Sequence, residues 1–522
     1  MTMKRIAQFP LHTLLLSIYP AIALMSANVS QIDLWLVRRP LLASLIFGCV
    51  LLGLAWWVFR SLQKAAIITS YVLLLFFSYG HIHQLLLESS EFLFNLSHHK
   101  FLGSIFILLL LGGVFLLSRR KKDLQEATSA LNMIAAALVI LAIIPVVSYK
   151  IRLEQSKGTA QAGITRDISY SGDPQKMPDI YYIILDSYTR ADALQRDFDY
   201  DNSSFISKLE QIGFQVGDCS RSNYGFTELS ISSTLNLNYL SALSNQFTPG
   251  NSDLTQATAL IQNNYVRKQL KELGYKIVGF ETGYAWNQWK DADLYVTPNT
   301  NMSLVAPLRP FEEMFLRSTA FRLIADTNKK LRSGLVDQLV PHHEQHVART
   351  MTMLEWLDKD LPAMAGPKFV YAHINVPHVP FVFESDGSLV EDSNFYRGEQ
   401  DYPVSEEYYQ KGYINQVQFV NNRIPGIVEN IIQSSERPVV IILQGDHGFM
   451  NENRLEILNA IYLGGDAVLL DRSMSPVNSF RIIFNKYFHG NFTYLENLSY
   501  LSTSELPYDL TLIPENAKEC EK

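Results

Sequence analysis

The chain has 522 residues, enough for two or three domains, and 48% of them are hydrophobic. Residues 1–150 carry 12 basic and 5 acidic side chains, whereas residues 151–522 carry 32 basic and 46 acidic ones. The acidic excess of the larger part argues against a nucleic-acid-binding protein, because phosphate backbones are bound by basic surfaces.

Five apolar stretches, almost free of internal charge, occupy the first 150 residues. Each has about the length that a helix needs to cross roughly 30 Å of hydrocarbon, and no small-residue cleavage site follows the first, so we expect membrane helices rather than a signal peptide. A single stretch would also suit a buried helix of a soluble domain, but five in close succession would not. The stretches are Phe9 to Ala27, Leu41 to Phe59, Ala65 to Leu87, Phe101 to Ser118 and Leu131 to Ser148.

The charges of the short loops predict the orientation, because loops rich in Lys and Arg stay in the cytoplasm. The basic residues fall into two alternating sets, the larger with Lys4, Arg5, Arg60, Lys64, Arg119, Arg120, Lys121 and Lys122, the smaller with Arg38, Arg39 and Lys100. The larger set is therefore expected inside. With five spans, everything after Ser148 would lie outside, which predicts a multi-pass protein of the plasma (inner) membrane with a periplasmic or extracellular domain.

The exported part is expected to begin with a polar linker at 151–177, followed by one domain at 178–522. Short runs that are apolar on both faces alternate with helical patterns, which is typical of a mainly parallel α/β sheet covered by helices on both sides. The expected strands are 179–186, 275–280, 368–374 and 437–444, and the clearest helices are 203–213, 262–274 and 406–432. Ligands of such sheets bind outside the carboxyl ends of the strands.

Two of the four expected strands end in an acidic residue. The run "IYYIILD" ends at Asp186, and "VVIILQGD" ends at Asp446 with His447 directly after it. One such aspartate would suit a turn or a cap, but two, one with an adjacent histidine, predict a metal site, and oxygen and imidazole ligands suit Zn²⁺ or Mn²⁺. Gly445 and Gly448 are expected to let the backbone turn sharply there.

A nucleophile for such a metal is expected in "SRSNYGFTELSISSTLN", residues 220–236. Thr227 or Ser230 would lie at a helix N-terminus, where a bound metal would lower the pKa of the hydroxyl, although an ordinary helix cap explains the same residues. His373 and His378 are candidates for binding substrate phosphate or for proton transfer.

Three further histidines, in the polar segment "PHHEQH", are expected to be solvated, with weak metal binding as the alternative. The amphipathic segment 309–324 is expected either to lie along the membrane surface or to cover the domain as an ordinary helix. Cys219 and Cys520 would meet an oxidising environment, and whether they pair is left open.

The chain resembles the alkaline phosphatase superfamily, in its sulfatase-like branch, in the order of four motifs: "IILDSYTR", "SNYGFTELSISSTLN", "HINVPHVPF" and "QGDHG". Five spans before an exported catalytic domain are similar to the membrane phosphoethanolamine transferases and to the phosphoglycerol transferases that include lipoteichoic acid synthase. The resemblance implies that Asp186, Thr227, Asp446 and His447 bind the metal, that Thr227 is also the nucleophile, and that His378 contacts the substrate phosphate.

The function expected from this resemblance is metal-dependent transfer of phosphoethanolamine or phosphoglycerol from a membrane phospholipid, through a threonine-bound intermediate, to an extracytoplasmic glycan or lipid acceptor. A phosphate ester or diester hydrolase is the nearest alternative, and a non-catalytic membrane protein that binds glycan or lipid is a more distant one. The stretch "FTELSIS" lacks the Cys-x-Pro-x-Arg pattern of sulfatases, which argues against sulfate-ester hydrolysis.

Overall fold

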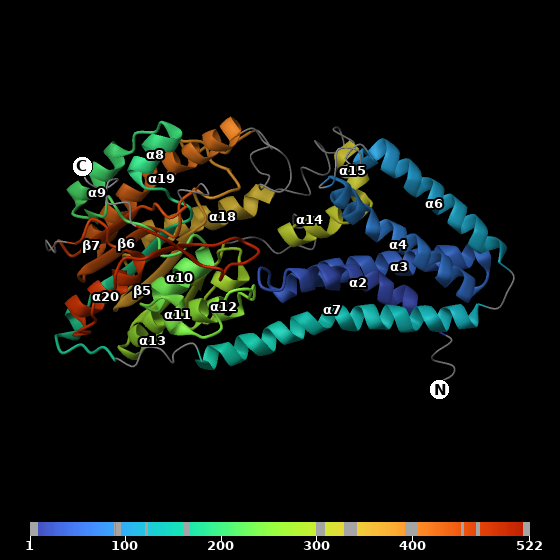
Figure 1. Ribbon diagram of the computed structural model, residues 1–522, viewed down its shortest axis with the longest axis horizontal. Helices are drawn as coiled ribbons and strands as arrows, with labels where there is room; N and C mark the ends of the chain where they lie inside the picture. Colours follow the sequence, from blue (N-terminus) through green and yellow to red (C-terminus); the bar gives the residue numbers. More distant parts are fainter. Residues whose placement is uncertain are drawn as a thin grey trace. The chain divides into compact units, whose positions relative to one another are not determined.

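The computed structural model describes residues 9–87, 89, 96–120, 124–159, 167–298, 308–327, 342–391, 406–449, 454–465 and 470–514. The chain forms two compact units, which are described separately (Figure 1). Unit 1 comprises Met1–Ile151 and Asn301–His342, and unit 2 comprises Arg152–Thr300 and His343–Lys522. The stretch Asn301–His342 thus belongs with the apolar N-terminal helices, although it lies inside the domain expected at 178–522.

Unit 1 is built from long apolar helices. In the described part, four helical stretches are long and apolar enough to cross a membrane: Leu34–Phe59, Leu62–Leu87, His99–Arg119 and Gln125–Lys157. The first apolar helix, α2 (Leu11–Ala27), has only 17 residues, so the count of five spans is not confirmed, and the orientation derived from it stays a prediction. Many apolar side chains of these helices are exposed, as a lipid environment requires.

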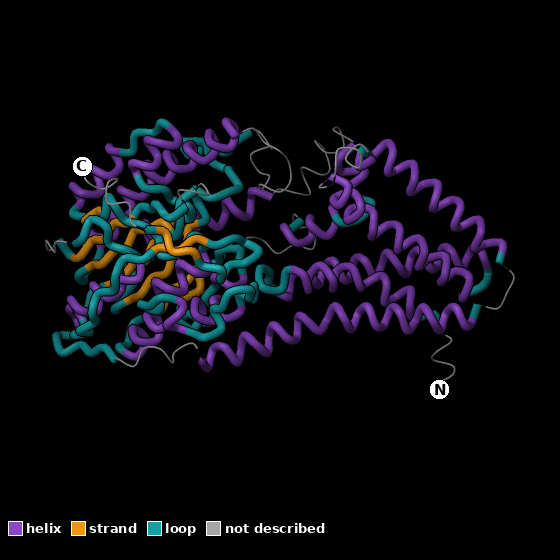
Figure 2. The backbone as a smooth tube through the Cα atoms, in the orientation of Figure 1, coloured by secondary structure: helices purple, strands orange, loops and turns teal. Residues whose placement is uncertain are grey.

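The bounds of these helices differ in places from the apolar stretches in the sequence. Helix α7 continues to Thr159, well into the segment expected as a linker at 151–177 (Figure 2). A helix needs no apolar residues to continue, because its own backbone hydrogen bonds hold it together. The remaining long helices are α3 (Arg38–Phe59), preceded by the short helix η1 (Leu34–Val37), α4 (Leu62–Leu87) and α6 (His99–Arg119).

The segment 308–327 packs against the apolar helices of unit 1. It forms α14 (Pro310–Arg317) and α15 (Phe321–Thr327). Phe311 and Phe315 are buried in one apolar cluster with residues of α2, α3, α4 and α7. The backbone of Arg317 approaches Gly80 of α4 so closely that a Cβ at Gly80 would overlap its carbonyl oxygen. The apolar face of the expected amphipathic segment is therefore covered by these helices.

Unit 2 contains a seven-stranded sheet in the order β2-β7-β6-β1-β5-β3-β4. Neighbours among β6, β1, β5, β3 and β4 run parallel, whereas β7 pairs antiparallel with β6 and β2. All four expected strands are present, which confirms the mainly parallel sheet. The strands are β1 (Asp179–Leu185), β2 (Gln215–Val216), β3 (Lys276–Phe280), β4 (Leu294–Val296), β5 (Lys368–Ile374), β6 (Val439–Gly445) and β7 (Asn459–Leu463). A separate hairpin pairs β8 (Ser499–Leu501) with β9 (Thr511–Ile513).

Helices cover both faces of this sheet (Figure 1). One face carries α8 (Ala191–Phe198), α9 (Ser203–Ile212), α18 (His342–Glu355) and α19 (Glu406–Ser434), and the other carries α10 (Thr227–Leu235), α12 (Thr255–Gln262), α13 (Tyr265–Glu272) and α20 (Pro476–Tyr487). The short helix α11 (Leu240–Leu243) belongs to a separate apolar cluster that includes Leu229 of α10.

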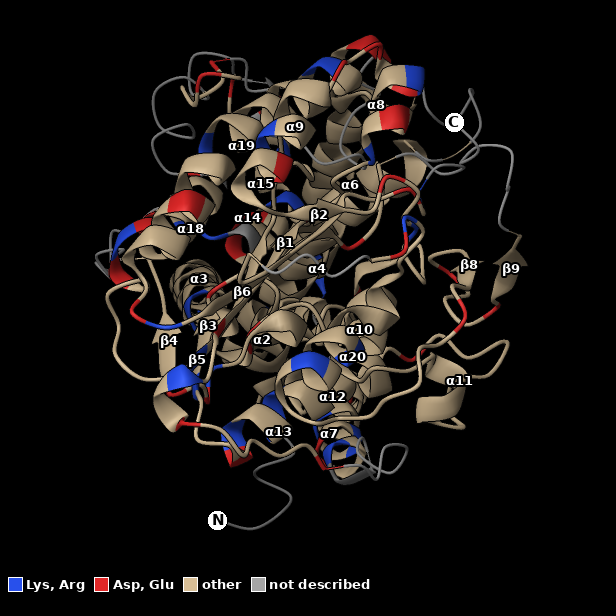
Figure 3. Cartoon of the chain, turned by 90° about the vertical axis from the view of Figure 1, so that its left-hand side faces the viewer, with Lys and Arg blue, Asp and Glu red and all other residues tan. Residues whose placement is uncertain are grey.

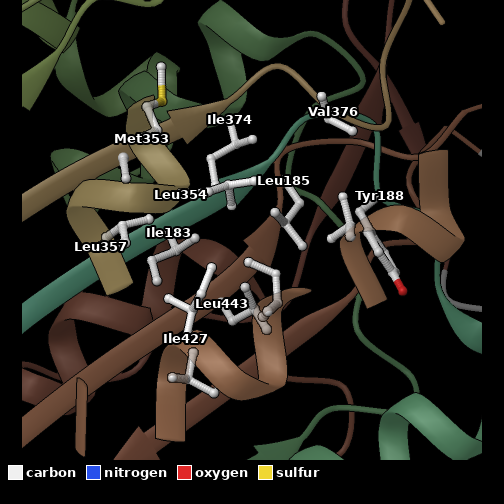
Figure 4. Packing of buried hydrophobic residues seen from close by; sticks show 14 of the residues in the cluster. Ile183, Leu185, Tyr188, Met353, Leu354, Leu357, Ile374, Val376, Ile427 and Leu443 are labelled. Carbon is white, nitrogen blue, oxygen red and sulfur yellow. The ribbon is translucent and has the colours of Figure 1, made fainter. Parts of the chain in front are cut away.

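The two faces of the sheet have separate apolar cores. Figure 4 shows Leu354 of α18 and Ile427 of α19 packed over Ile183 and Leu443 of the central strands. Charged residues lie mainly on outer helices such as α8, α13 and α18, while the central strands are almost free of them (Figure 3). Burial on both faces explains why these strands read as continuous apolar runs in the sequence.

Candidate metal centre

The site lies at the carboxyl ends of the three central strands β6, β1 and β5. Leu185, the last residue of β1, is in register with Gly445 of β6 and with Ile374 of β5. Asp186 and Asp446 follow these positions directly, so the two carboxylates emerge side by side at the same edge of the sheet. The expectation that these aspartates meet at one strand edge is confirmed.

Asp446 presents one oxygen that is unused. Its Oδ1 accepts a hydrogen bond of 3.0 Å from the backbone N–H of Ser187, and its side chain is buried. Its Oδ2 has no hydrogen-bond partner among the described residues. A buried carboxylate oxygen without a donor is costly, which makes this atom a natural ligand for a cation.

His447 turns one ring nitrogen toward the two carboxylates. Its Nδ1 lies 2.7 Å from the carbonyl oxygen of Gly448 and therefore carries a proton and donates it, which leaves Nε2 without one. That Nε2 lies 3.6 Å from Asp446 Oδ2 and 3.8 Å from Asp186 Oδ1. Burial lowers the pKa of His447, which favours the neutral ring that metals bind.

His373 joins this group from the next-to-last position of β5. Its Nε2 lies 3.4 Å from Asp186 Oδ2 without forming a hydrogen bond, and its Nδ1 contacts the side-chain amide of Asn287. Asp186, His373 and Asp446 each offer a potential ligand atom, and these atoms lie within 4.8 Å of one another. His373, expected to bind substrate, is thus also placed as a possible metal ligand.

The electrostatics of Asp186 favour its ionised form. Burial by itself raises the pKa of the carboxyl group, but His378, His373 and His447 more than offset that effect, and the resulting pKa is lowered. A set of two carboxylates and two imidazoles, in which two buried atoms have no hydrogen-bond partner among the described residues, fits a divalent metal such as Zn²⁺ or Mn²⁺.

Thr227 is the first residue of α10 and is half-buried. The ring of Phe226, its neighbour in sequence, lies 4.7 Å below the guanidinium of Arg454, whose Nη2 is in turn 3.4 Å from His447 Nε2. The alternative hydroxyl, Ser230, is buried, and its Oγ lies 3.1 Å from that of Ser222. Of the two candidate nucleophiles, Thr227 is the more accessible.

His378 lies beside the metal centre. Its backbone N–H donates a hydrogen bond of 3.1 Å to the carbonyl oxygen of Asp186, and its ring centroid is 6.3 Å from that of His447. The Nδ1 of His378 lies 2.8 Å from the carbonyl oxygen of Val379 and donates a hydrogen bond to it. The ring is half-buried, and its contact with a substrate stays a prediction.

The expectation that the histidines of "PHHEQH" are solvated is wrong for His346. This residue is buried on α18, and burial lowers the pKa of its ring to about 3. Arg349, one turn further along, is also buried enough to lower its pKa. The sequence does contain a signal for this burial. His346 and Arg349 precede Met353 and Leu354 at intervals of three to four residues, which places them near the apolar face of the helix. The side chains of His342 and His343 lie outside the described residues.

Glu456 connects the segments that carry the site residues, and no sequence pattern points to it. Its buried carboxylate lies 3.0 Å from the Nη2 of Arg190 and 2.6 Å from that of Arg196. Arg190 also donates to the carbonyl oxygen of Ser220, at 3.0 Å. The segments after Asp186, before Thr227 and after Asp446 are thereby held together through one ion-pair network.

The close approach of the backbone at Gly445 explains why this residue is a glycine: a Cβ there would lie 2.5 Å from the carbonyl oxygen of Tyr188.

Cys219 is disulfide-bonded and Cys49 is free, while Cys520 lies outside the described residues. A disulfide is typical of a domain exposed to an oxidising compartment.

Comparison with known proteins found no matching family model and no matching curated protein. Solved structures similar to the chain include the integral membrane lipooligosaccharide phosphoethanolamine transferase A, EptA, from Neisseria meningitidis, with 9% identity, a TM-score of 0.42, and coverage of 94% of this chain and 97% of that chain. The zinc complex of the C-terminal periplasmic domain of EcEptC from Escherichia coli has 11% identity and a TM-score of 0.42, covering 67% of this chain and 95% of that chain. The putative sulfatase yidJ from Bacteroides fragilis has 14% identity and a TM-score of 0.35, covering 61% of this chain and 75% of that chain.

Proposed function

We propose that this chain is a membrane-bound, metal-dependent phosphotransferase. It would move a phosphorylated head group, phosphoethanolamine or phosphoglycerol, from a membrane phospholipid to an extracytoplasmic glycan or lipid. One observation carries the proposal: two carboxylates and two imidazoles converge at the ends of three adjacent parallel strands, beside a helix that begins with a threonine. Such a set suits a metal that activates a hydroxyl group, and the neighbouring helix supplies that hydroxyl.

Asp186, Asp446 and His447 would hold the metal, with His373 as a further candidate ligand. A divalent metal in this position supplies positive charge that lowers the pKa of a hydroxyl group and stabilises phosphoryl oxygens. The hydrogen bond from His447 to Gly448 and the one from Ser187 to Asp446 fix the orientation of the two ligands.

Thr227 would act as the nucleophile. Its Oγ1 forms a bond with the lipid phosphorus while the bond from phosphorus to the glycerol oxygen breaks, and that oxygen takes up a proton and leaves as diacylglycerol. In the second step an acceptor hydroxyl forms the bond with phosphorus, and Thr227 regains its proton. Arg454 and His378, which both lie next to His447, would contact the phosphate oxygens.

The apolar helices of unit 1 give this chemistry its location. A lipid donor is confined to the membrane, so an enzyme anchored there meets it at a high effective concentration. The disulfide at Cys219 and the expected orientation of the helices support a catalytic unit on the periplasmic or extracellular face of the inner membrane.

The test is a search for the covalent intermediate. Detergent-solubilised full-length protein is incubated with phosphatidylethanolamine or phosphatidylglycerol that carries an isotopic label in its head group, and the digested protein is analysed by mass spectrometry. We expect the label on the peptide that contains Thr227, absent from Thr227→Ala and retained in Ser230→Ala, the matched hydroxyl control. Head-group release that continues unchanged in Thr227→Ala would contradict the proposal.

The same incubation separates a transferase from a hydrolase. A transferase keeps the adduct until an acceptor glycan or lipid is added, after which the label moves to that acceptor. A hydrolase releases free phosphoethanolamine or glycerol phosphate at one rate with or without the acceptor.

A further inference from the structure

A second cluster of ligand-type side chains lies within unit 1, apart from the residues of the proposed catalytic site. His83 belongs to α4, His99 begins α6, and Asp326 belongs to α15. Each offers one potential ligand atom, and these atoms lie within 4.8 Å of one another. Three elements that are far apart in the sequence thus bring two imidazoles and a carboxylate to one point.

Hydrogen bonds already organise two of the three side chains. The hydroxyl of Tyr79 lies 2.8 Å from His99 Nδ1, and His99 Nε2 lies 3.1 Å from Asp326 Oδ2. The Nε of Arg322 lies 3.3 Å from the same carboxylate oxygen. The position and rotation of the His99 ring are therefore fixed before any ligand arrives, which is what a neighbouring hydrogen-bond partner does for a metal-binding histidine.

His83 is the member of the cluster that the protein leaves unsatisfied. Its ring is stacked on that of His99, with centroids 4.5 Å apart, and only 6% of the residue is exposed. Its Nδ1 is buried and, within the part of the chain that the structure describes, has no hydrogen-bond partner. Leaving a buried ring nitrogen unpaired has a cost, and that cost is removed if the nitrogen binds a ligand.

We propose that His83, His99 and Asp326 form a second metal site, selective for Zn²⁺ or a similar divalent transition metal. Two imidazole nitrogens and one carboxylate oxygen are borderline ligands that suit zinc, with water completing a tetrahedral shell. The metal enters between His99 Nε2 and Asp326 Oδ2, and the ligand atoms draw together around it. With the metal on Nε2, the ring proton of His99 is on Nδ1, which then donates to the Tyr79 oxygen.

The site has a structural role, because its ligands come from three separate elements. Zinc bound there joins α15 to the ends of α4 and α6, in addition to the packing of the same segment at Gly80 and at Gly103, where a Cβ would lie 2.8 Å from Leu323. The segment 308–327 would thus be attached to the apolar helices by a coordination bond as well as by side-chain packing.

The first test is a count of zinc. Full-length protein in detergent is stripped with a chelator, incubated with excess Zn²⁺ and desalted, and the zinc per chain is measured by plasma mass spectrometry. We expect His83→Ala to bind one zinc fewer than the unmodified chain. His81→Ala is the matched control, since it removes an exposed histidine from the same helix and leaves the count unchanged.

The two metal sites are distinguished by combining variants. Asp446→Asn should lose the zinc of the proposed catalytic site. The double variant Asp446→Asn, His83→Ala should therefore bind two zinc ions fewer per chain than the unmodified protein. An unchanged zinc count in His83→Ala overturns the second site, whatever the result for Asp446→Asn.

A second measurement does not depend on loss of binding. In Asp326→Cys the carboxylate is replaced by a thiolate, and Co²⁺ bound at the site then shows a thiolate-to-cobalt charge-transfer band in the near ultraviolet. The unmodified chain is the reference and should lack this band, because its cluster contains no cysteine and Cys219 is disulfide-bonded. Absence of the band in folded, Co²⁺-loaded Asp326→Cys also overturns the proposal.

Discussion

Replacement of Glu456 tests whether the buried ion pair with Arg190 holds the site segments together. Both side chains are almost completely buried, with 5% of the Arg190 side chain and 4% of the Glu456 side chain exposed. In Glu456→Ala the carboxylate is lost, while the Arg190 guanidinium stays in place with Asp192, which is 47% exposed, as its remaining acidic partner. The variant therefore leaves a buried charge that is only partly compensated.

The expected cost follows from this burial. Removing one partner of a buried ion pair destabilises a protein by about 3–5 kcal/mol, because the other charge stays desolvated. At roughly 2 °C per kcal/mol, the lower end of the range for large domains, unit 2 should melt about 6–10 °C earlier. Glu456→Gln keeps two polar atoms near Arg190 and should lose less.

The assay is thermal unfolding of the full-length protein in detergent, followed by near-ultraviolet circular dichroism. Unit 2 contributes the buried Trp286 and Trp289 to this signal. Asp197→Ala is the matched control: Asp197 pairs with Arg196, whose side chain is 43% exposed, so its loss should shift the melting temperature by less than about 2 °C. If Glu456→Ala melts within 2 °C of this control, the buried pair does not hold these segments together.

Three further predictions concern the metal and close backbone contacts. Asp446→Asn should lower the zinc or manganese content of purified protein by one ion per chain, as measured by plasma mass spectrometry, and an equal content would remove this residue from the site. Gly445→Ala should cost about 1–3 kcal/mol in thermal unfolding, because its Cβ meets the Tyr188 carbonyl oxygen and that backbone cannot move freely. Gly80→Ala should displace the Arg317 backbone and make segment 308–327 more susceptible to limited proteolysis, and unchanged cleavage would show that the contact is unimportant.

The central strands could be predicted because burial on both faces produces continuous apolar runs that end at polar residues. Strand β7 was not predicted, because its sequence does not begin as an apolar run. It begins at Asn459, whose buried amide oxygen accepts a hydrogen bond of 2.9 Å from Gln444, so a polar residue stands where the pattern requires an apolar one. Local sequence does not reveal that a distant amide will satisfy it.

The candidate site was predictable where its chemistry follows strand ends directly, as for Asp186 and Asp446. Glu456 was not, because its role depends on ion pairs between segments that only the folded chain brings together. The segment 308–327 is a similar case: its amphipathic pattern indicates an apolar face, but a pattern of this kind does not specify which surface will cover it.

The assignment of segment 308–327 to unit 1 changes how the protein can be divided. The chain passes between the two units three times, after Ile151, after Thr300 and after His342. A truncated protein that begins after the last apolar helix would therefore carry Phe311 and Phe315 without the helices that cover them, and would expose an apolar surface prone to aggregation. A soluble catalytic unit suited to crystallisation or to assays in free solution should be made by removing residues 301–342 as well, with a short flexible linker in their place.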